Sequence, residues 1–314
     1  MDHRTGEGVL VLGSTGFIGS HLVDRLSAQG HQVYALARSE MPSDIDGIRH
    51  VRGSIDDGEL LRSVVARCSH IVHVASLTTP SASATEPDLE VTGNLGALAQ
   101  LLSLANEFPG RRLIYMSSAG AVYGDLAIDV DESSTLRPRS YYGAGKAAAE
   151  AFVHACTATT SWEAVILRAS NIYGPGQLAG KGFAIIPTLL SRAAEGGAFT
   201  IWGDGKVVRD YCHVTDLIDL TMKAVEHDHC PRFSVHNAAS GATVSVLELI
   251  AACERVTGRK IKVAFEPARS VDVPHVSFNT DSAHALYQWK AKIPLYEGLG
   301  QTWRWFIESQ GHDR

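Results

Sequence analysis

The sequence lacks the long apolar segments that membrane-bound and exported proteins carry. No apolar run of about 18 residues occurs, so we expect no transmembrane helix. The N-terminal residues M-D-H-R-T-G-E-G contain no apolar stretch of the kind that forms a signal peptide, which predicts a cytoplasmic protein. The formal net charge of −6 argues against nucleic acid as a main partner.

Cysteine is scarce, and its spacing excludes the usual cysteine-based sites. The 314 residues include five cysteines with no C-x-x-C pair, which predicts reduced thiols rather than a disulfide framework. His227, His229 and Cys230 lie close together, but no second cluster has the spacing of metal ligands. We therefore expect no bound metal.

Apolar residues make up 45% of the chain, enough for a large core in one or two domains. Strand and helix signals alternate through the first half, which predicts a doubly wound parallel α/β sheet of the Rossmann type. The expected strands are residues 9–12, 31–37, 47–53, 70–74, 112–116 and 164–167. The expected helices include residues 56–67, 89–108 and 141–158.

The second half has a different composition and too few strand signals to continue the sheet. A glycine-rich connection over residues 173–182 precedes an expected helix at 185–195, and the Gly203-Asp204-Gly205 turn suggests a hairpin within 200–211. Further helices are expected at 244–257 and 295–309. We predict a dinucleotide-binding domain over residues 1–170 and a smaller α/β substrate lobe over 171–314, from which a few segments could return to the sheet.

The stretch G-V-L-V-L-G-S-T-G-F-I-G, residues 8–19, is the strongest local signal. A buried strand leads into a turn with the spacing Gly13-x-x-Gly16-x-x-Gly19, and an amphipathic helix follows. Glycines let the backbone approach a pyrophosphate, and the helix N-terminus offers unpaired N–H groups. An ordinary strand-to-helix turn is the alternative, but the order and position favour binding of NAD or NADP(H). The expected contacts from this stretch are Gly13, Thr15, Gly16, Phe17, Ile18 and Gly19.

Tyr142 and Lys146 are four residues apart, which places both on one face of a helix. A tyrosine has an ordinary pKa near 10, and a nearby ammonium would lower it. The pair could therefore exchange a proton with a sugar hydroxyl while Lys146 holds the cofactor ribose. Ser117 and Ser118 end the fifth expected strand, and either hydroxyl could bond the reacting oxygen. The alternatives without a catalytic role are that Tyr142 and Lys146 form an exposed pair on a helix, and that Ser117 and Ser118 are ordinary turn residues.

Taken together, these motifs resemble the extended short-chain dehydrogenase/reductase superfamily, in particular its nucleotide-sugar epimerase/dehydratase family with UDP-galactose 4-epimerase. The resemblance covers roughly residues 9–305. It includes H-V-A-S at residues 73–76, A-V-Y-G-D at 121–125, L-R-A-S-N-I-Y-G-P-G at 167–176 and W-G-D-G-K-V-V-R-D-Y-C-H-V-T-D at 202–216. It implies a homodimer that acts on a nucleotide-diphosphate sugar with NAD or NADP(H).

The resemblance also assigns residues that the motifs alone do not. It places Asn171 and Arg209 near the sugar diphosphate, where a guanidinium suits phosphate oxygens. It assigns Ser54, Ile55 and Ala75 to the cofactor. From the variable second lobe, we expect Phe183, Ile186 and Leu189 near the nucleotide base. The dimer it implies would form through the helices at residues 89–108 and 141–158.

Departures from the family pattern narrow the chemistry. Relatives often carry the catalytic Ser or Thr where this chain has Ala119, so Ser118 would need a shifted loop to serve. Dehydratases and decarboxylases of the family carry an acid in this loop, but Gly120 and Ala121 follow here, which disfavours both reactions. Ala37 replaces the acid that bonds the ribose of NAD, and Arg38 follows it. That exchange favours NADP(H), unless Arg38 only stacks on adenine.

Three functions remain open at this point. The first is a C4 epimerase of a nucleotide sugar, which works through a 4-keto intermediate with Tyr142 as acid and base. The second is an NADPH-dependent reductase of 4-keto-6-deoxy-sugar nucleotides. The third is a dinucleotide-binding protein without activity, which the retained Tyr142 and Lys146 disfavour.

Overall fold

The computed structural model describes residues 8–39, 47–78, 84–124, 128–180, 184–268 and 273–312. The chain divides into two compact units. Unit 1 comprises residues 1–122, 140–168 and 218–236, and unit 2 comprises residues 123–139, 169–217 and 237–314. Each unit has its own hydrophobic cluster, so we describe each by itself.

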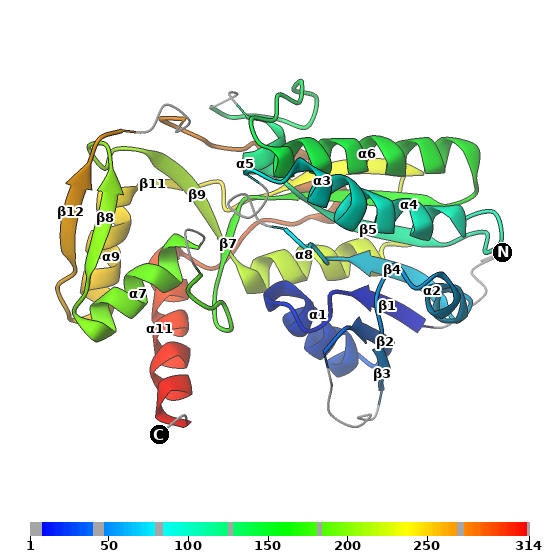
Figure 1. Ribbon diagram of the computed structural model, residues 1–314, viewed down its shortest axis with the longest axis horizontal. Coiled ribbons are helices and arrows are strands. Elements are labelled where there is room, and N and C mark those ends of the chain that lie inside the picture. Colours follow the sequence, from blue (N-terminus) through cyan, green and yellow to red (C-terminus); the bar gives the residue numbers. More distant parts are fainter. Residues whose placement is uncertain are drawn as a thin grey trace. The chain divides into compact units, whose positions relative to one another are not determined.

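A seven-stranded sheet forms the centre of unit 1, with the order β10-β6-β5-β4-β1-β2-β3 (Figure 1). The strands β1 to β5 pair in parallel. This confirms the predicted doubly wound sheet, whose order reverses between β1 and β4. The bounds are β1 Gly8–Leu12, β2 Gln32–Ala37, β3 Ile48–Arg52, β4 Cys68–His73, β5 Arg112–Ser118, β6 Glu163–Ala169 and β10 Phe233–Ala238. The last of these strands, β10, comes from the second half of the chain.

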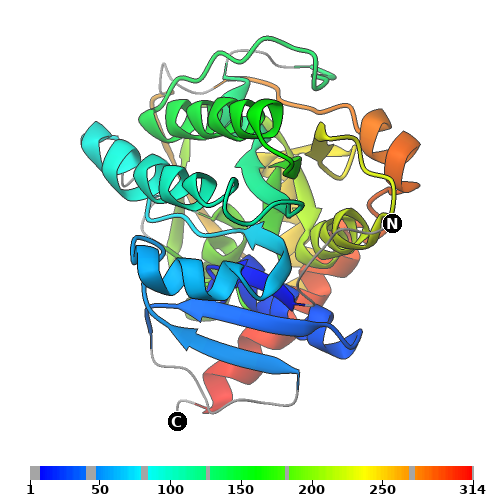
Figure 2. The same ribbon diagram turned by 90° about the vertical axis from the view of Figure 1, so that its right-hand side faces the viewer.

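Helices cover both faces of this sheet. On one face lie α2 (Gly58–Val65), α4 (Gly96–Ser103) and α6 (Tyr141–Thr159), and the cyan α4 and green α6 run side by side in Figure 2. On the other lie α1 (Phe17–Ala28) and α8 (Val214–Glu226), joined by an ion pair of 2.9 Å between Arg25 and Asp219 (Figure 1).

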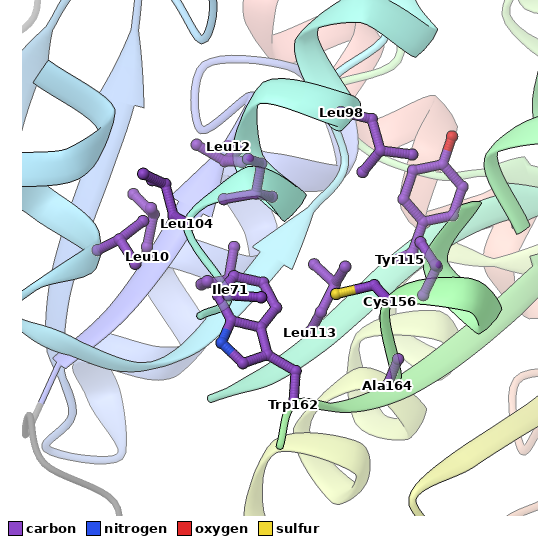
Figure 3. Close-up of a cluster of buried hydrophobic side chains, with 14 of the residues drawn as sticks. Leu10, Leu12, Ile71, Leu98, Leu104, Leu113, Tyr115, Cys156, Trp162 and Ala164 are labelled. Atoms are coloured by element: carbon purple, nitrogen blue, oxygen red, sulfur yellow. The ribbon is translucent and has the colours of Figure 1, made fainter. Parts of the chain in front are cut away.

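The core of unit 1 fills the space between the sheet and the helices α2, α4 and α6, and Figure 3 shows part of it. Trp162 is 1% exposed, and its indole N–H donates to the Phe108 carbonyl at 2.7 Å. Leu113 and Ile71 come from adjacent strands and pack beside it. Uninterrupted apolar runs such as β1 are expected where both faces of a parallel sheet are covered.

The long helix expected over residues 89–108 is interrupted. The structure has a single turn α3 (Pro87–Leu89), a π-helical segment η1 (Glu90–Leu95) and then α4, which ends at Ser103. Gly93 and Gly96 have low helix propensity and lower the cost of departing from α-helical geometry. Glu90 and Asn94 are bonded to Thr78 outside the helix, which holds the wider turn in place.

Unit 2 packs helices against two small sheets. The helices include α7 (Ile185–Glu195), α9 (Val246–Thr257), α10 (Asp281–Tyr287) and α11 (Leu295–His312). One sheet has the order β11-β9-β7, from Thr243–Ser245, Val208–His213 and Asn171–Tyr173. The other pairs β12 (Lys262–Glu266) with β8 (Ala198–Trp202) in parallel. A short helix of unit 1, α5 (Ala119–Val122), follows β5.

The hairpin expected within residues 200–211 is wrong. Both strands form, but β8 pairs with β12, whereas β9 pairs with β7 and β11. The glycine turn is present, with Gly203 and Gly205 both at positive φ. It joins two different sheets because Gly203 donates to the Glu266 carbonyl and thereby continues the β12 pairing.

Among the described residues, no helix is long and apolar enough to cross a membrane.

Candidate active site

The glycine turn after β1 is packed too closely for side chains. A Cβ at Gly13 would lie 2.8 Å from the backbone of Ala75, which follows β4, and Gly13 has φ of +89°. A Cβ at Gly19 would lie 2.0 Å from the Gly13 carbonyl oxygen. The turn therefore brings bare backbone to the carboxyl edge of the sheet, where doubly wound folds bind dinucleotides.

The N-terminus of α1 fits the pyrophosphate of such a cofactor. Gly16 is the N-cap and supplies no side-chain hydrogen bond to the first turn. Thr15 and Gly16 are exposed, whereas Phe17 and Ile18 are half-buried. Ser14 is not a contact of this kind, since its buried hydroxyl donates to the Leu36 carbonyl at 3.0 Å. The first-turn N–H groups and the helix dipole are thus available to an anion.

Tyr142 and Ser118 meet at the same edge. Ser118 is the last residue of β5, and Tyr142 is in the first turn of α6, which begins at the N-cap Ser140. The Ser140 hydroxyl accepts from Gly143 N–H at 3.0 Å, which fixes the start of the helix. The side chains of Ser118 and Tyr142 are hydrogen-bonded to each other, and both are half-buried.

Lys146 lies one helical turn further along α6 and is 7% exposed. Its ammonium donates to the Met116 carbonyl at 2.9 Å and to the Tyr115 hydroxyl at 3.4 Å. It lies 5.8 Å from the centre of the Tyr142 ring. Burial lowers the pKa of Lys146 to about 8, while the carboxylates of Glu90 and Glu150 oppose that change. An ammonium has three N–H groups, so one can still reach a cofactor ribose.

The pKa of Tyr142 moves in the opposite direction to the one expected from Lys146 alone. Burial, followed by the negative charge of Glu90, raises the pKa of Tyr142 to about 12, and the bond with Ser118 offsets only part of this change. In the protein without ligands, Tyr142 is therefore a phenol and a proton donor.

Ser117 points into the core rather than toward Tyr142. It is 3% exposed, and its hydroxyl donates to the Glu150 carboxylate. Glu150 in turn forms an ion pair of 2.7 Å with Arg168 of β6. Of the two candidate serines, only Ser118 is bonded to Tyr142.

Glu90 is the site residue that the sequence analysis missed. It begins η1, is 4% exposed and accepts hydrogen bonds from Thr78 and from Asn94, the latter at 2.8 Å. Gly145 of α6 passes directly over it, because a Cβ there would lie 2.8 Å from a Glu90 carboxylate oxygen. The only hint in the sequence is that Glu90 and Asn94 are two polar residues one turn apart.

The remaining residues expected at the cofactor lie at the ends of β2 and β3. Arg38 is exposed directly after β2, and Ser54 and Ile55 are half-buried after β3. Strand register places Ala37 opposite Arg52, which is also exposed. Two arginines thus lie at the carboxyl ends of neighbouring strands.

Two of the expected substrate contacts lie on neighbouring strands of unit 2. Asn171 on β7 donates from its amide to the Asp210 carbonyl at 2.8 Å. Arg209 on β9 is half-buried and donates to the Val273 carbonyl at 2.7 Å. Asp210 is fully buried, and its carboxylate accepts hydrogen bonds from the Ser240 hydroxyl and the Gly241 N–H.

The residues expected near the nucleotide base differ in position. Ile186 is 1% exposed and Leu189 is fully buried, and both belong to the hydrophobic cluster of unit 2. A contact between Ile186 and the nucleotide base stays a prediction, and the buried side chain exposes little surface for it. Phe183 lies outside the described residues.

Unit 1 therefore carries a glycine turn open to a pyrophosphate and a phenol–ammonium pair at the same sheet edge, the arrangement of a dinucleotide-dependent oxidoreductase. Residues 9–238 match the NAD dependent epimerase/dehydratase family, and the chain belongs to that family. It is accordingly an NAD(P)-dependent enzyme, which removes the non-catalytic alternative.

Individual relatives span both remaining reactions. The chain is 28% identical to a dTDP-4-dehydro-6-deoxy-D-allose reductase of Streptomyces bikiniensis, over 97% of this chain and 98% of the relative. It is 30% identical to a UDP-glucose 4-epimerase of Mycolicibacterium smegmatis, over 95% and 97%. Among solved structures, MoeE5 in complex with UDP-glucuronic acid and NAD is 30% identical, with a TM-score of 0.88 over 96% of this chain and 99% of that one.

Proposed function

We propose that the enzyme is a nucleotide-sugar 4-epimerase that works through a 4-keto intermediate. The observation that carries the proposal is the Ser118–Tyr142–Lys146 arrangement, which can exchange one proton with a sugar hydroxyl. No acid follows in residues 119–124, so the loop offers no group to expel water or to assist loss of a carboxylate. The chemistry that remains is oxidation and reduction at a carbinol carbon.

In this proposal, the chain's residues handle the proton at C4. When bound, NAD(P) supplies the acceptor and donor of the hydride. Tyr142 accepts the proton of the C4 hydroxyl as that carbon is oxidised, and it returns the proton to the oxygen after the sugar has turned its other face. Ser118 donates to the same oxygen and stabilises its developing charge. Tyr142 rests as a phenol, so it must lose that proton before the first step. The Lys146 ammonium stabilises the resulting phenolate, which is present before Tyr142 accepts the sugar proton and again after it returns that proton.

Substrate binding is proposed for Asn171 and Arg209. Both occupy the adjacent strands β7 and β9, and a guanidinium can meet two phosphate oxygens at once. The relatives named above act on, or are bound to, UDP and dTDP sugars, which supports a nucleotide-diphosphate sugar here.

The experiment is to incubate the purified enzyme with UDP-glucose, UDP-galactose and their N-acetyl and uronate forms, with no cofactor added. We expect interconversion at C4, and a loss of roughly a thousandfold in turnover for Tyr142→Phe, which removes the proton carrier. Ser117→Ala serves as the control, because that hydroxyl is bonded to Glu150. Failure to interconvert any of these sugars would refute the epimerase.

A reductase of 4-keto-6-deoxy-sugar nucleotides is the second candidate. Two observations favour it: Tyr142 rests as a phenol, ready to donate a proton, and Arg38 is exposed directly after β2, where a guanidinium could pair with a 2′-phosphate. Such an enzyme consumes NADPH with a 4-keto sugar nucleotide, and it should be purified without a tightly held dinucleotide. Stoichiometric NAD released on denaturation would argue for the epimerase instead.

A further inference from the structure

Glu90 is a buried carboxylate with no cationic neighbour of its own among the described residues except Lys146. Its two hydrogen-bond donors, Thr78 and Asn94, are both neutral. The other carboxylate near Lys146 is Glu150, which is already paired with Arg168. Burying an unpaired charge is costly, so a carboxylate kept in this position needs a compensating charge nearby.

The surroundings bring Glu90 and the reactive pair together across a glycine. Gly145 separates Tyr142 from Lys146 on α6, and a Cβ at this position would lie 2.8 Å from a Glu90 oxygen and 3.3 Å from the Glu90 Cβ. Any larger residue at 145 would force η1 and α6 apart or displace the carboxylate. The π-helical turn of η1 and the absence of a side chain at Gly145 thus both allow Glu90 to approach α6 closely.

We propose that Glu90 is a positioning residue of the Tyr142–Lys146 pair. Its carboxylate, held by Thr78 and Asn94 and facing α6 across Gly145, keeps Lys146 charged in a buried site and keeps the proton on Tyr142 at rest. The effect of Glu90 on turnover rests on the proposed function. Its effect on the protonation of Tyr142 and Lys146 does not.

Four further titratable groups of the described residues lie near Tyr142 and Lys146, and of these only the two carboxylates, Glu90 and Glu150, carry charge at neutral pH. Tyr115 on β5 accepts a hydrogen bond from Lys146, and His73 on β4 packs against Tyr115 with ring centres 5.2 Å apart and ring planes tilted by 53°. The pKa of His73 is lowered to about 3 by burial and by Lys146, so it adds no charge at neutral pH. The pKa of Tyr115 is raised by burial, so it also stays neutral. Of the two carboxylates, only Glu90 lacks an arginine partner.

The direct test measures Lys146 itself by NMR. In protein labelled with ¹³C-lysine, the Cε resonance of Lys146 is assigned from its absence in Lys146→Arg and titrated with pH. We expect its pKa near 8 to fall by about one unit in Glu90→Gln, since the amide keeps the size and shape of the side chain but removes the charge and one of the two acceptors. Glu86→Gln is the matched control, because Glu86 is exposed one turn before Glu90.

A second variant protects the test from a folding defect. Gly145→Ala leaves Glu90 in the chain but displaces its carboxylate, and it should lower the Lys146 pKa in the same direction. Gly300→Ala is its control, since a Cβ there meets nothing within 4 Å. A Lys146 resonance that titrates identically in wild type, Glu90→Gln and Gly145→Ala would overturn the proposal.

Turnover gives the second readout. In Glu90→Gln the pH profile of kcat/KM should move to lower pH by about one unit, with roughly a tenfold loss on its alkaline side, where Lys146 loses its charge early. A uniform loss with no shift would indicate a merely structural role and would count against the proposal. If no nucleotide sugar is turned over, the epimerase fails, but the NMR titration still decides the role of Glu90.

Discussion

At the scale of single residues, His73 is a buried imidazole that makes stability depend on pH. It is 5% exposed, and neither ring nitrogen has a hydrogen-bond partner. Its pKa in the folded protein is about 3, whereas an unfolded histidine takes up a proton near pH 6.5. Between these values the unfolded chain binds more protons, so the free energy of unfolding falls as the pH falls, by up to about 1.4 kcal/mol per pH unit.

The variant His73→Phe should remove this contribution while keeping the ring against Tyr115. Urea unfolding between about pH 7 and pH 5 should then show a flatter decline in stability than wild type. His229→Gln, at an exposed position, should leave the decline unchanged. An unaltered slope in His73→Phe would show that His73 does not carry the effect.

Arg38 tests the choice of dinucleotide. Arg38→Asp replaces a cation with the acid that binds a free ribose, so affinity for NADPH should fall and affinity for NADH should rise. A charge-assisted hydrogen bond contributes roughly 2 kcal/mol, which corresponds to about a thirtyfold change in Kd. Titration of both cofactors by fluorescence checks this, with Arg49→Gln on the same sheet as the control. Equal NADPH affinity in wild type and Arg38→Asp would mean that Arg38 does not contact the phosphate.

Sequence motifs predicted Tyr142, Lys146 and Ser118 as neighbours, since helical spacing and strand order place them at one edge. They could not predict the charge around them. The pKa of Tyr142 is raised first by burial and then by the charge of Glu90, which approaches from a different helix at a point where Gly145 has no side chain. Local spacing carries no information about such a contact between segments more than 50 residues apart.

At the scale of elements, the turn between β1 and α1 has no tolerance for a methyl group. In Gly19→Ala the new Cβ would meet the Gly13 carbonyl at 2.0 Å, so the turn must open. We expect dinucleotide affinity to fall by at least tenfold and the protein to be destabilised by roughly 1–3 kcal/mol. Calorimetric titration with NAD and NADP measures the first effect and thermal unfolding the second. Gly300→Ala, in an open part of the helix α11, should leave the dinucleotide affinity unchanged and should not destabilise the protein, because alanine has the higher helix propensity.

Element type was easier to predict than pairing. Six strands of the first sheet and the helix Ile185–Glu195 follow from apolar periodicity, whereas β10 was not predicted as a strand. The β8–β9 hairpin was wrong because turn chemistry specifies a reversal of the chain but not the partner strand, which β12 supplies from more than 50 residues away. The break between α3 and α4 could not be predicted either, since it depends on the hydrogen bonds that link Glu90 and Asn94 with Thr78.

At the scale of the whole molecule, unit 1 exposes apolar side chains on α3, η1 and α6. Val91 on η1 is 60% exposed, Leu89 is 38% exposed and Phe152 on α6 is 46% exposed. Ala151 and Ala155 continue the exposed face of α6 and permit close helix packing. Two such helix pairs related by a twofold axis form a four-helix bundle, so we propose a homodimer through η1, α4 and α6.

Phe152→Glu should dissociate this dimer, because the interface would bury a carboxylate beside its own symmetry mate. Sedimentation at micromolar concentration should give about twice the 33.7 kDa chain mass for wild type and the single mass for the variant. Phe265→Glu is the control, since Phe265 on β12 is 57% exposed but belongs to unit 2. A monomeric wild type would refute the interface and leave the reactive pair of each chain independent of any partner.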